Sequence, residues 1–252
     1  MIYIKSEFDI TNIKKACDIW KFTKNELIKY IKEGISLNQI DEFARNIIES
    51  KGAICTFKDY SGFKGNICLS VNDVVIHGVP SEYILKNKDM LSLDIGVTYN
   101  NYVCDSAFTV IIGENEEAEK INKVCYQSLL EGINQIKPGN KIGDISNAIQ
   151  TYVEKEGYHI LPDFGGHGCG IKLHEDPIIL NYGTRDSGPT LREGMIVCLE
   201  PMILTGSSDY YIDKKDKWSV KSKNKKLTCH WEHMILVTKN GYEILTLDEE
   251  KE

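Results

Sequence analysis

An internal repeat constrains the fold of this chain more than any other feature of its sequence. The segment 31–52, "IKEGISLNQIDEFARNIIESKG", returns 105 residues later at 136–157 as "IKPGNKIGDISNAIQTYVEKEG", without a gap. Both copies place apolar residues at the spacing of one helix face, and both end on a glycine. We therefore expect two related halves, each containing an amphipathic helix.

Each copy of the repeat is preceded by a second helical pattern, at about 9–32 and about 116–136, and is followed by strand-like sequence. The strand-like segments are "ICLSV", "DVVIHGV" and "MLSLDIGVTYNNYVCDSAFTVII" in the first half, then "IVCLEPMIL", "HMILVT" and "YEILTL" in the second. The pattern predicts an α+β fold and a single domain, 1–252, with halves of roughly 1–112 and 113–252. Helices are expected outside and strands at a pseudo-twofold seam, where a site draws residues from both halves.

The net charge of −7 is opposite to the basic surface of a general nucleic-acid-binding protein. One local exception, 214–226, carries seven lysines, for which a solvated loop is favoured over an RNA contact. No apolar run approaches the ~20 residues of a membrane span, and the N-terminus lacks the pattern of a signal peptide. We expect a cytoplasmic protein that binds no membrane and no specific nucleic acid.

The eight cysteines lie far apart, mostly in apolar runs, and form no CxxC pair. This pattern predicts buried free thiols in a reducing compartment. Cys104 and Cys169 are close in sequence to the acid and histidine motifs described next, so these two are the candidates for oxidation or metal binding.

Two histidines stand seven residues apart in the glycine-rich stretch "GGHGCGIKLHEDP", at 165–177. A helix would separate His167 and His174 by two turns, roughly 10 Å, and the glycines disfavour a helix. In a regular strand the odd spacing would send the two rings to opposite faces. We therefore expect a bent loop or strand end, with one imidazole acting as a ligand and the other as a donor.

Two aspartates are predicted to share one face of a hairpin. If Asn100 and Asn101 form its turn, Asp94 lies opposite Ala107, and Asp105 is a diagonal neighbour at about 7 to 8 Å between Cα atoms. Both carboxylates then reach one cation or flank a pair.

The second half supplies Glu200 at the end of one apolar strand and Glu232 inside another. The repeat offset of 105 residues makes Asp94 equivalent to Leu199, which is next to Glu200, so the two halves place acids at nearly equivalent positions. Any one of these acids, taken alone, fits a strand-edge residue facing water. Four together, without matching lysines or arginines, repel one another, and one or two divalent cations resolve that repulsion.

Five motifs carry a family resemblance: "HGVP" with His77, "LDIGVTYNNYVCDSAFTV", "GGHGCGIKLHEDP", "LREGMIVCLEPM" and "HWEH". In order and spacing they resemble those of type I methionine aminopeptidases, over nearly the whole chain. The resemblance implies the pseudo-twofold pita-bread fold, a curved antiparallel sheet covered by outer helices. It also implies removal of N-terminal methionine from nascent proteins and peptides, with a small second residue favoured.

The resemblance further implies a site for two divalent metal ions, chosen among Mn, Fe(II), Co and Zn. The implied metal ligands are Asp94, Asp105, His167, Glu200 and Glu232, with Asp105 and Glu232 bridging. Glu200 is implied to act as general base, while His77 and His174 contact the substrate as donors.

A closed methionine pocket is implied by the same resemblance, with His77 and His174 beside it. Its lining residues are Phe57, Tyr60, Phe63, Cys68, Leu173 and Trp218. Three features depart from the family pattern: Leu173 in place of an aromatic residue, "FKGNIC" without the usual proline and serine, and Cys169 beside His167. These departures concern pocket size and rate more than the type of reaction.

Two rival functions stay open at this point. Proline-specific aminopeptidases share the fold and ligand set, but they usually carry a large N-terminal domain, for which the first ~75 residues here are expected to leave no room. A non-catalytic peptide- or RNA-binding relative would have lost metal ligands, and all five are intact. We also expect a monomer that lacks a zinc-binding extension, so any contact with the ribosome would use the surface of the domain itself.

Overall fold

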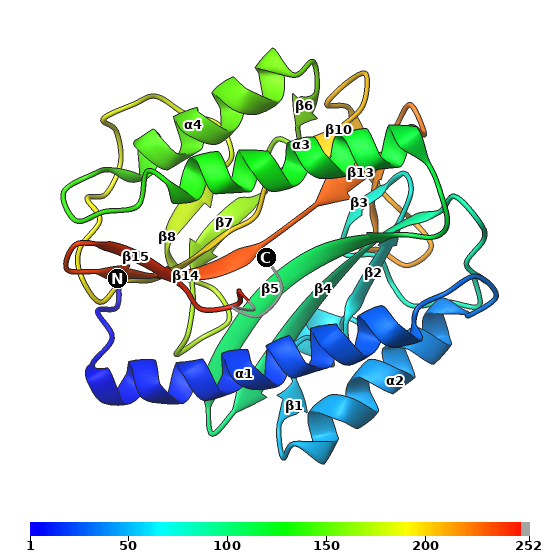
Figure 1. The fold of residues 1–252 in the computed structure, drawn as a ribbon, viewed down its shortest axis with the longest axis horizontal. Coiled ribbons are helices and arrows are strands. Elements are labelled where there is room, and N and C mark those ends of the chain that lie inside the picture. The colour runs from blue at the N-terminus through cyan, green and yellow to red at the C-terminus, as the bar shows by residue number, and fades with distance from the viewer. Residues whose placement is uncertain (248–252) are drawn as a thin grey trace.

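The computed structural model describes residues 1–247, and its four long helices lie on two sides of the strands (Figure 1). Helices α1 (Glu7–Tyr30) and α2 (Leu37–Ser50) belong to the first half, and α3 (Glu116–Ile133) and α4 (Ile142–Lys155) belong to the second. The two repeat copies are α2 and α4, as predicted. Each is followed by a glycine at positive φ, Gly52 at 72° and Gly157 at 81°, a conformation that costs glycine least.

The predicted hairpin is confirmed residue by residue. Strands β4 (Met90–Tyr99) and β5 (Tyr102–Ile111) are joined by Asn100 and Asn101, both at positive φ, and Asp94 pairs with Ala107. On the same sheet, β1 (Ile54–Cys55) and β2 (Cys68–Val71) pair with β4. A short 3-10 turn, η1 (Tyr60–Gly62), lies between them in the sequence.

The second half contains a five-stranded antiparallel sheet in the order β15-β14-β9-β7-β8. Its strands are β7 (Gly165–Gly168), β8 (Glu175–Leu180), β9 (Ile196–Leu199), β14 (His233–Thr238) and β15 (Gly241–Ile244). Two three-stranded sheets complete the fold. They comprise β6 (His159–Ile160), β10 (Met202–Leu204) and β13 (Thr228–His230), and β3 (Val74–Ile76), β11 (Tyr210–Ile212) and β12 (Val220–Ser222).

The two halves meet where β5 runs beside the segment that joins β13 to β14. The backbone N–H of Glu232 donates to the Ala107 carbonyl at 3.0 Å, and the N–H of Ala107 donates back at 3.3 Å. The hydroxyl of Ser106 also donates to the Glu232 carbonyl, and that of Thr109 donates to the His230 carbonyl at 2.7 Å. These bonds join β5 of the first half to the second half beside Asp105.

The prediction of a solvated loop at 214–226 is wrong for Val220–Ser222, which form β12 between β11 and β3. Val220 and Ser222 are buried there, so strand pairing outweighs the high local charge. All eight cysteines are free and buried, as the sequence predicted. In the stretch 1–247, no helix is both long enough and apolar enough to span a membrane.

Candidate metal centre and substrate pocket

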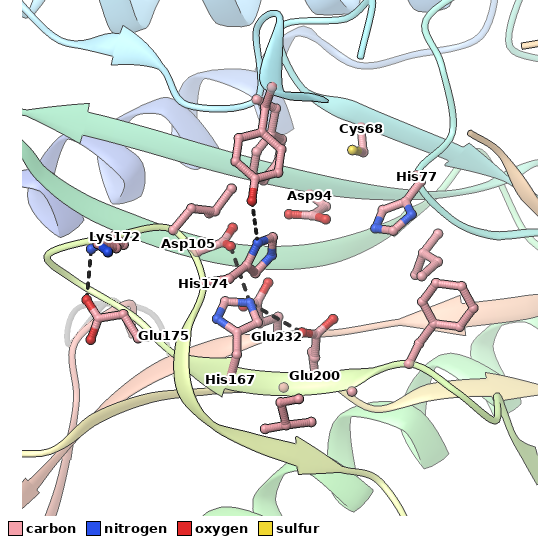
Figure 2. Close-up of a pocket in the computed structure, with 18 of the residues that line it drawn as sticks. Cys68, His77, Asp94, Asp105, His167, Lys172, His174, Glu175, Glu200 and Glu232 are labelled. Carbon is pink, nitrogen blue, oxygen red and sulfur yellow. Dashed lines mark hydrogen bonds and ion pairs between the residues drawn. The ribbon is translucent and has the colours of Figure 1, made fainter. Parts of the chain in front are cut away.

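Four acidic side chains from both halves converge at the seam (Figure 2). Asp94 and Asp105 come from neighbouring strands of the first half, and Glu200 and Glu232 follow β9 and β13 of the second. Asp105 and Glu232 are buried, while Asp94 and Glu200 are only slightly accessible. All four line one cavity of about 660 Å³.

Burial keeps these acids from ionising freely. It raises the pKa of Asp94 to about 7 and that of Glu200 to about 8. Burial, and then repulsion from the neighbouring acids, raises the pKa of Asp105 and of Glu232 well above the ordinary range. Ionisation of all four acids therefore requires a compensating positive charge within the cluster.

His167 presents one ring nitrogen to this cluster. Its Nδ1 lies 3.0 Å from the Gly168 carbonyl, to which an Nδ1–H donates, so Nε2 keeps a free lone pair. Nε2 lies 3.8 Å from Asp105 Oδ2 and 3.6 Å from Glu200 Oε1. Burial lowers the pKa of His167 to about 4, which holds the ring in the neutral form that binds metal.

The glycines around His167 allow β7 to lie tightly between β8 and β9. A Cβ atom at Gly166 would lie 2.0 Å from the Cys198 carbonyl oxygen, and one at Gly168 would lie 2.3 Å from the Asp176 carbonyl oxygen. The sequence predicted a bent loop or a strand end here, and the structure has both: His167 lies in β7 and His174 lies in the loop that follows it. The pairing of β7 with β8 was not predicted.

His174 lies in the loop between β7 and β8, which a buried ion pair holds in place. Glu175 accepts the backbone N–H groups of Ile171 and Lys172 at 2.7 and 2.8 Å, and its other oxygen accepts Lys5 Nζ at 2.6 Å. The Nδ1 atom of His174 lies 3.0 Å from the hydroxyl of Tyr60. The two histidines therefore have different surroundings, while the predicted division into one ligand and one donor stays a prediction.

His77 lies on the other side of the acids, beside Cys68 in Figure 2. Its φ of 56° is in the left-handed region, a strained conformation that is often associated with functional sites. The ring packs edge-on against Phe164 and Trp218, with centroids 5.9 and 6.0 Å away. Burial lowers the pKa of His77 to about 4, so the ring is neutral at physiological pH.

All the predicted pocket residues line the same cavity as the acids. They are Phe57, Tyr60, Phe63, Cys68, Leu173 and Trp218, together with His77 and His174. The expectation of a closed pocket is wrong at Tyr60, whose side chain is 42% exposed because it stands on the short η1 turn. The buried side chains of Phe57, Phe63 and Cys68 form the inner part of the cavity.

His230 belongs to the centre but was not singled out from the sequence. Its buried Nε2 has no hydrogen-bond partner and lies 3.6 Å from Glu200 Oε2. The available signal was the spacing of two residues to Glu232, which in an extended segment directs both side chains to the same face.

The donor set fits divalent cations. Asp105, His167 and Glu232 each place a ligand atom within 4.8 Å of the others. Oδ1 of Asp94, Oδ1 of Asp105 and Oε1 of Glu232 are buried without a hydrogen-bond partner. Carboxylate oxygens with one imidazole suit a catalytic Mn(II), Fe(II), Co(II) or Zn(II) ion. A structural zinc site is instead built mainly from thiolates.

Comparisons with known proteins agree with this chemistry. The model of metallopeptidase family M24 matches residues 11–239. Methionine aminopeptidase of Mycoplasma genitalium is 44% identical over 248 residues, 98% of this chain and 100% of the relative. Methionine aminopeptidase 1 of Bacillus subtilis is 41% identical over 247 residues, 98% of this chain and 99% of the relative.

Solved structures confirm the pita-bread fold expected from the resemblance. The crystal structure of methionine aminopeptidase from Rickettsia prowazekii matches with a TM-score of 0.96 and 37% identity, covering 98% of this chain and 100% of that one. Prolidase from Pyrococcus furiosus, at a TM-score of 0.76 and 24% identity, shares the fold, and this chain covers 66% of its length. The chain belongs to metallopeptidase family M24 and, within that family, to the methionine aminopeptidases.

Proposed function

We propose that this protein removes the N-terminal methionine from nascent proteins and peptides by metal-assisted hydrolysis. The observation that supports this proposal best is the juxtaposition of four acids, one lone-pair imidazole and an apolar cavity at the seam. Metal-assisted removal of one N-terminal residue needs metal ligands beside a pocket for one side chain, and residues of both kinds line this cavity.

Five residues are proposed to hold two divalent ions: Asp94, Asp105, His167, Glu200 and Glu232. Asp105 and Glu232 are the candidates to be shared between the ions, because each is buried among the other acids of the set. When bound, the ions would supply positive charge that polarises the scissile carbonyl and increases the acidity of water. Their identity is proposed to be Mn, Fe(II), Co or Zn.

Proton transfer and hydrogen bonding to the substrate are assigned to side chains that line the cavity. Glu200 accepts a proton from the attacking water, whose oxygen adds to the carbonyl carbon, and the released proton ends on the leaving nitrogen. His174 donates to the oxygen that develops negative charge, and His77 donates to the peptide backbone or the leaving nitrogen. The Tyr60 hydroxyl, by donating to Nδ1 of His174, leaves Nε2–H as the donor toward the substrate.

Selectivity for methionine is proposed to come from the inner part of the cavity. Phe57, Phe63, Cys68 and Trp218 present apolar and sulfur-compatible surface suited to a thioether. A small second residue is favoured because a long side chain beside His77 and His174 would misplace the carbonyl. Leu173 leaves room for norleucine or leucine, since one methylene is worth only about 1 to 3 kcal/mol of discrimination.

We further infer that the protein acts as a cytoplasmic monomer on emerging chain ends. Any contact with the ribosome would use the surface of this domain. Sedimentation of the purified protein alone tests the monomeric state, and sedimentation with ribosomes tests ribosome binding, both independently of catalysis.

A panel of four peptides, assayed with Mn(II)-loaded protein, tests the proposed reaction. We expect cleavage of Met-Ala-Ser, slower cleavage of Leu-Ala-Ser, and poor cleavage of Met-Leu-Ser and Ala-Pro-Ser. A preference for Ala-Pro-Ser would instead indicate a proline-specific enzyme. If metal-replete protein cleaves none of the peptides, the proposed function is wrong and a peptide-binding role is favoured.

A further inference from the structure

Two thiols lie beside His167, the one imidazole among the five proposed metal ligands. One ligand atom each from His167, Cys169 and Cys198 lies within 4.8 Å of the other two. Both cysteines are fully buried, and of the three residues His167 alone lines the cavity. The proposed reaction gives neither thiol a task.

Strand pairing fixes this arrangement. His167 of β7 pairs with Cys198 of β9, and directly paired residues of antiparallel strands point to the same face. The ladder has an irregularity after His167, and the N–H of Cys169 donates to the Ile196 carbonyl at 3.2 Å. The three donors are therefore held by backbone hydrogen bonds rather than by flexible loops.

We propose that His167, Cys169 and Cys198 form a second metal site, selective for thiophilic cations such as Zn(II) and Cd(II). Two thiolates and one imidazole are donors that soft and borderline ions prefer, whereas the carboxylate cluster suits harder ions. The thiol of Cys198 contacts the Glu232 carboxylate, which is a candidate for a fourth donor. As each metal–sulfur bond forms, the thiol releases its proton to solvent.

The two sites share a single nitrogen. Nδ1 of His167 is engaged by the Gly168 carbonyl, so only Nε2 remains for either the carboxylate side or the thiol side. A thiophilic ion at the second site therefore withdraws His167 from the first and displaces one of its ions. This inhibitory consequence rests on the proposed function, whereas the existence of the second site does not.

Cadmium titration of the metal-free full-length protein, kept reduced without added thiols, tests the site directly. Wild-type protein is expected to develop the ultraviolet charge-transfer absorption of cadmium bound to thiolate. Cys169→Ala and the double variant Cys169→Ala/Cys198→Ala are expected to lose most of this absorption. Cys125→Ala is the matched control, because Cys125 is a buried thiol beside another thiol, Cys229, and is expected to keep it.

Absence of the absorption in wild-type protein overturns the proposal, whether or not the variants fold. Equal absorption in folded Cys169→Ala and wild-type protein, checked by circular dichroism, also overturns it. The sharing of His167 is tested by dialysis: Cd(II) is expected to release one Mn(II) from loaded wild-type protein, and thiolate absorption without such release contradicts it. Peptide cleavage by Mn(II)-loaded protein is measured separately, so failure of the proposed function does not alter the cadmium result.

Discussion

His167 and His174 have ring centroids only 4.4 Å apart, yet they face different partners. His167 directs Nε2 toward Asp105 and Glu200, while His174 contacts Tyr60. We predict that His167→Ala loses bound metal. We also predict that His174→Ala keeps its metal but loses on the order of 2.7 to 4 kcal/mol of transition-state stabilisation, the usual effect of removing an oxyanion donor.

We would measure metal content by elemental analysis, and kcat, on the same preparations of these two variants. An equal loss of metal from both would contradict the assignment of different tasks to the two rings.

The Tyr60 hydroxyl is predicted to fix the tautomer of His174. Tyr60→Phe removes one hydrogen bond, worth about 1 kcal/mol, so kcat is expected to fall about fivefold while metal content stays constant. Tyr242→Phe is the control, because Tyr242 has a similar exposure of 39% and bonds Asn134 outside the cavity. If the two variants have the same kcat, Tyr60 does not position His174.

The chemical types of the site residues could be predicted from the sequence more completely than their contacts. Acids at the ends of apolar strands, and a glycine-flanked histidine, are unusual enough to stand out from the pattern alone. The contact of Tyr60 with His174 and the approach of His230 to Glu200 could not be predicted, because both join residues that are distant in the sequence. Only the packed fold determines which such side chains meet.

At the scale of elements, β7 depends on glycine to keep His167 in place. Gly166→Ala would put a Cβ atom 2.0 Å from the Cys198 carbonyl oxygen, so β7 and β9 would have to separate. We predict a loss of about 1 to 3 kcal/mol in unfolding free energy, together with weaker metal binding. Gly241→Ala is the control, because nothing lies within 4 Å of its added Cβ.

Chemical denaturation and metal titration of the two glycine variants measure these effects. A Gly166→Ala protein as stable as Gly241→Ala, with unchanged metal affinity, would show that the tight approach of β7 and β9 is not required.

Elements with strong periodicity were predictable, and elements whose pairing is mostly long-range were not. The β4–β5 hairpin followed from its Asn-Asn turn, and α2 and α4 followed from the repeat. The pairing of β7 with its neighbours and the existence of strand β12 were missed, because glycines and lysines conceal the alternation of these strands. Their pairing partners are distant in sequence, so tertiary packing decides their conformation.

At the scale of the molecule, each half supplies two of the four acids, so neither half contains the complete site. One apolar core cluster joins residues of α1 and α2 to Cys198 and Met234 of the second half. The single domain of 1–252 stays a prediction, and residues 248–252 lie outside the described part of the chain.

The free energy of unfolding of the metal-free protein depends on pH, because acids are buried together at the seam. The pKa of Asp94 is raised from 3.8 to about 7 and that of Glu200 from 4.5 to about 8, so the metal-free fold favours their protonated forms. Their stabilising contribution is complete below the unfolded pKa values and is lost as pH rises through about 7 and about 8. Histidines with lowered pKa add stability only up to about pH 6.5, so they do not oppose this trend at higher pH.

We therefore predict that the melting temperature of chelated protein falls between about pH 6.5 and about pH 8, while that of Mn(II)-loaded protein falls less. Calorimetry of both forms across this interval measures the difference. A melting temperature of the chelated protein that stays constant or rises would contradict the burial of uncompensated acids.

The most direct test of the account is a Mn(II) titration of metal-free protein in which heat and Met-Ala-Ser hydrolysis are followed in parallel. The account predicts that wild-type protein binds two ions and gains peptidase activity as they bind. Asp105→Asn is predicted to lose both, because a neutral amide replaces the carboxylate proposed to contact both ions. Wild-type turnover in Asp105→Asn, or a metal-saturated wild-type protein that cleaves no peptide, would contradict the account.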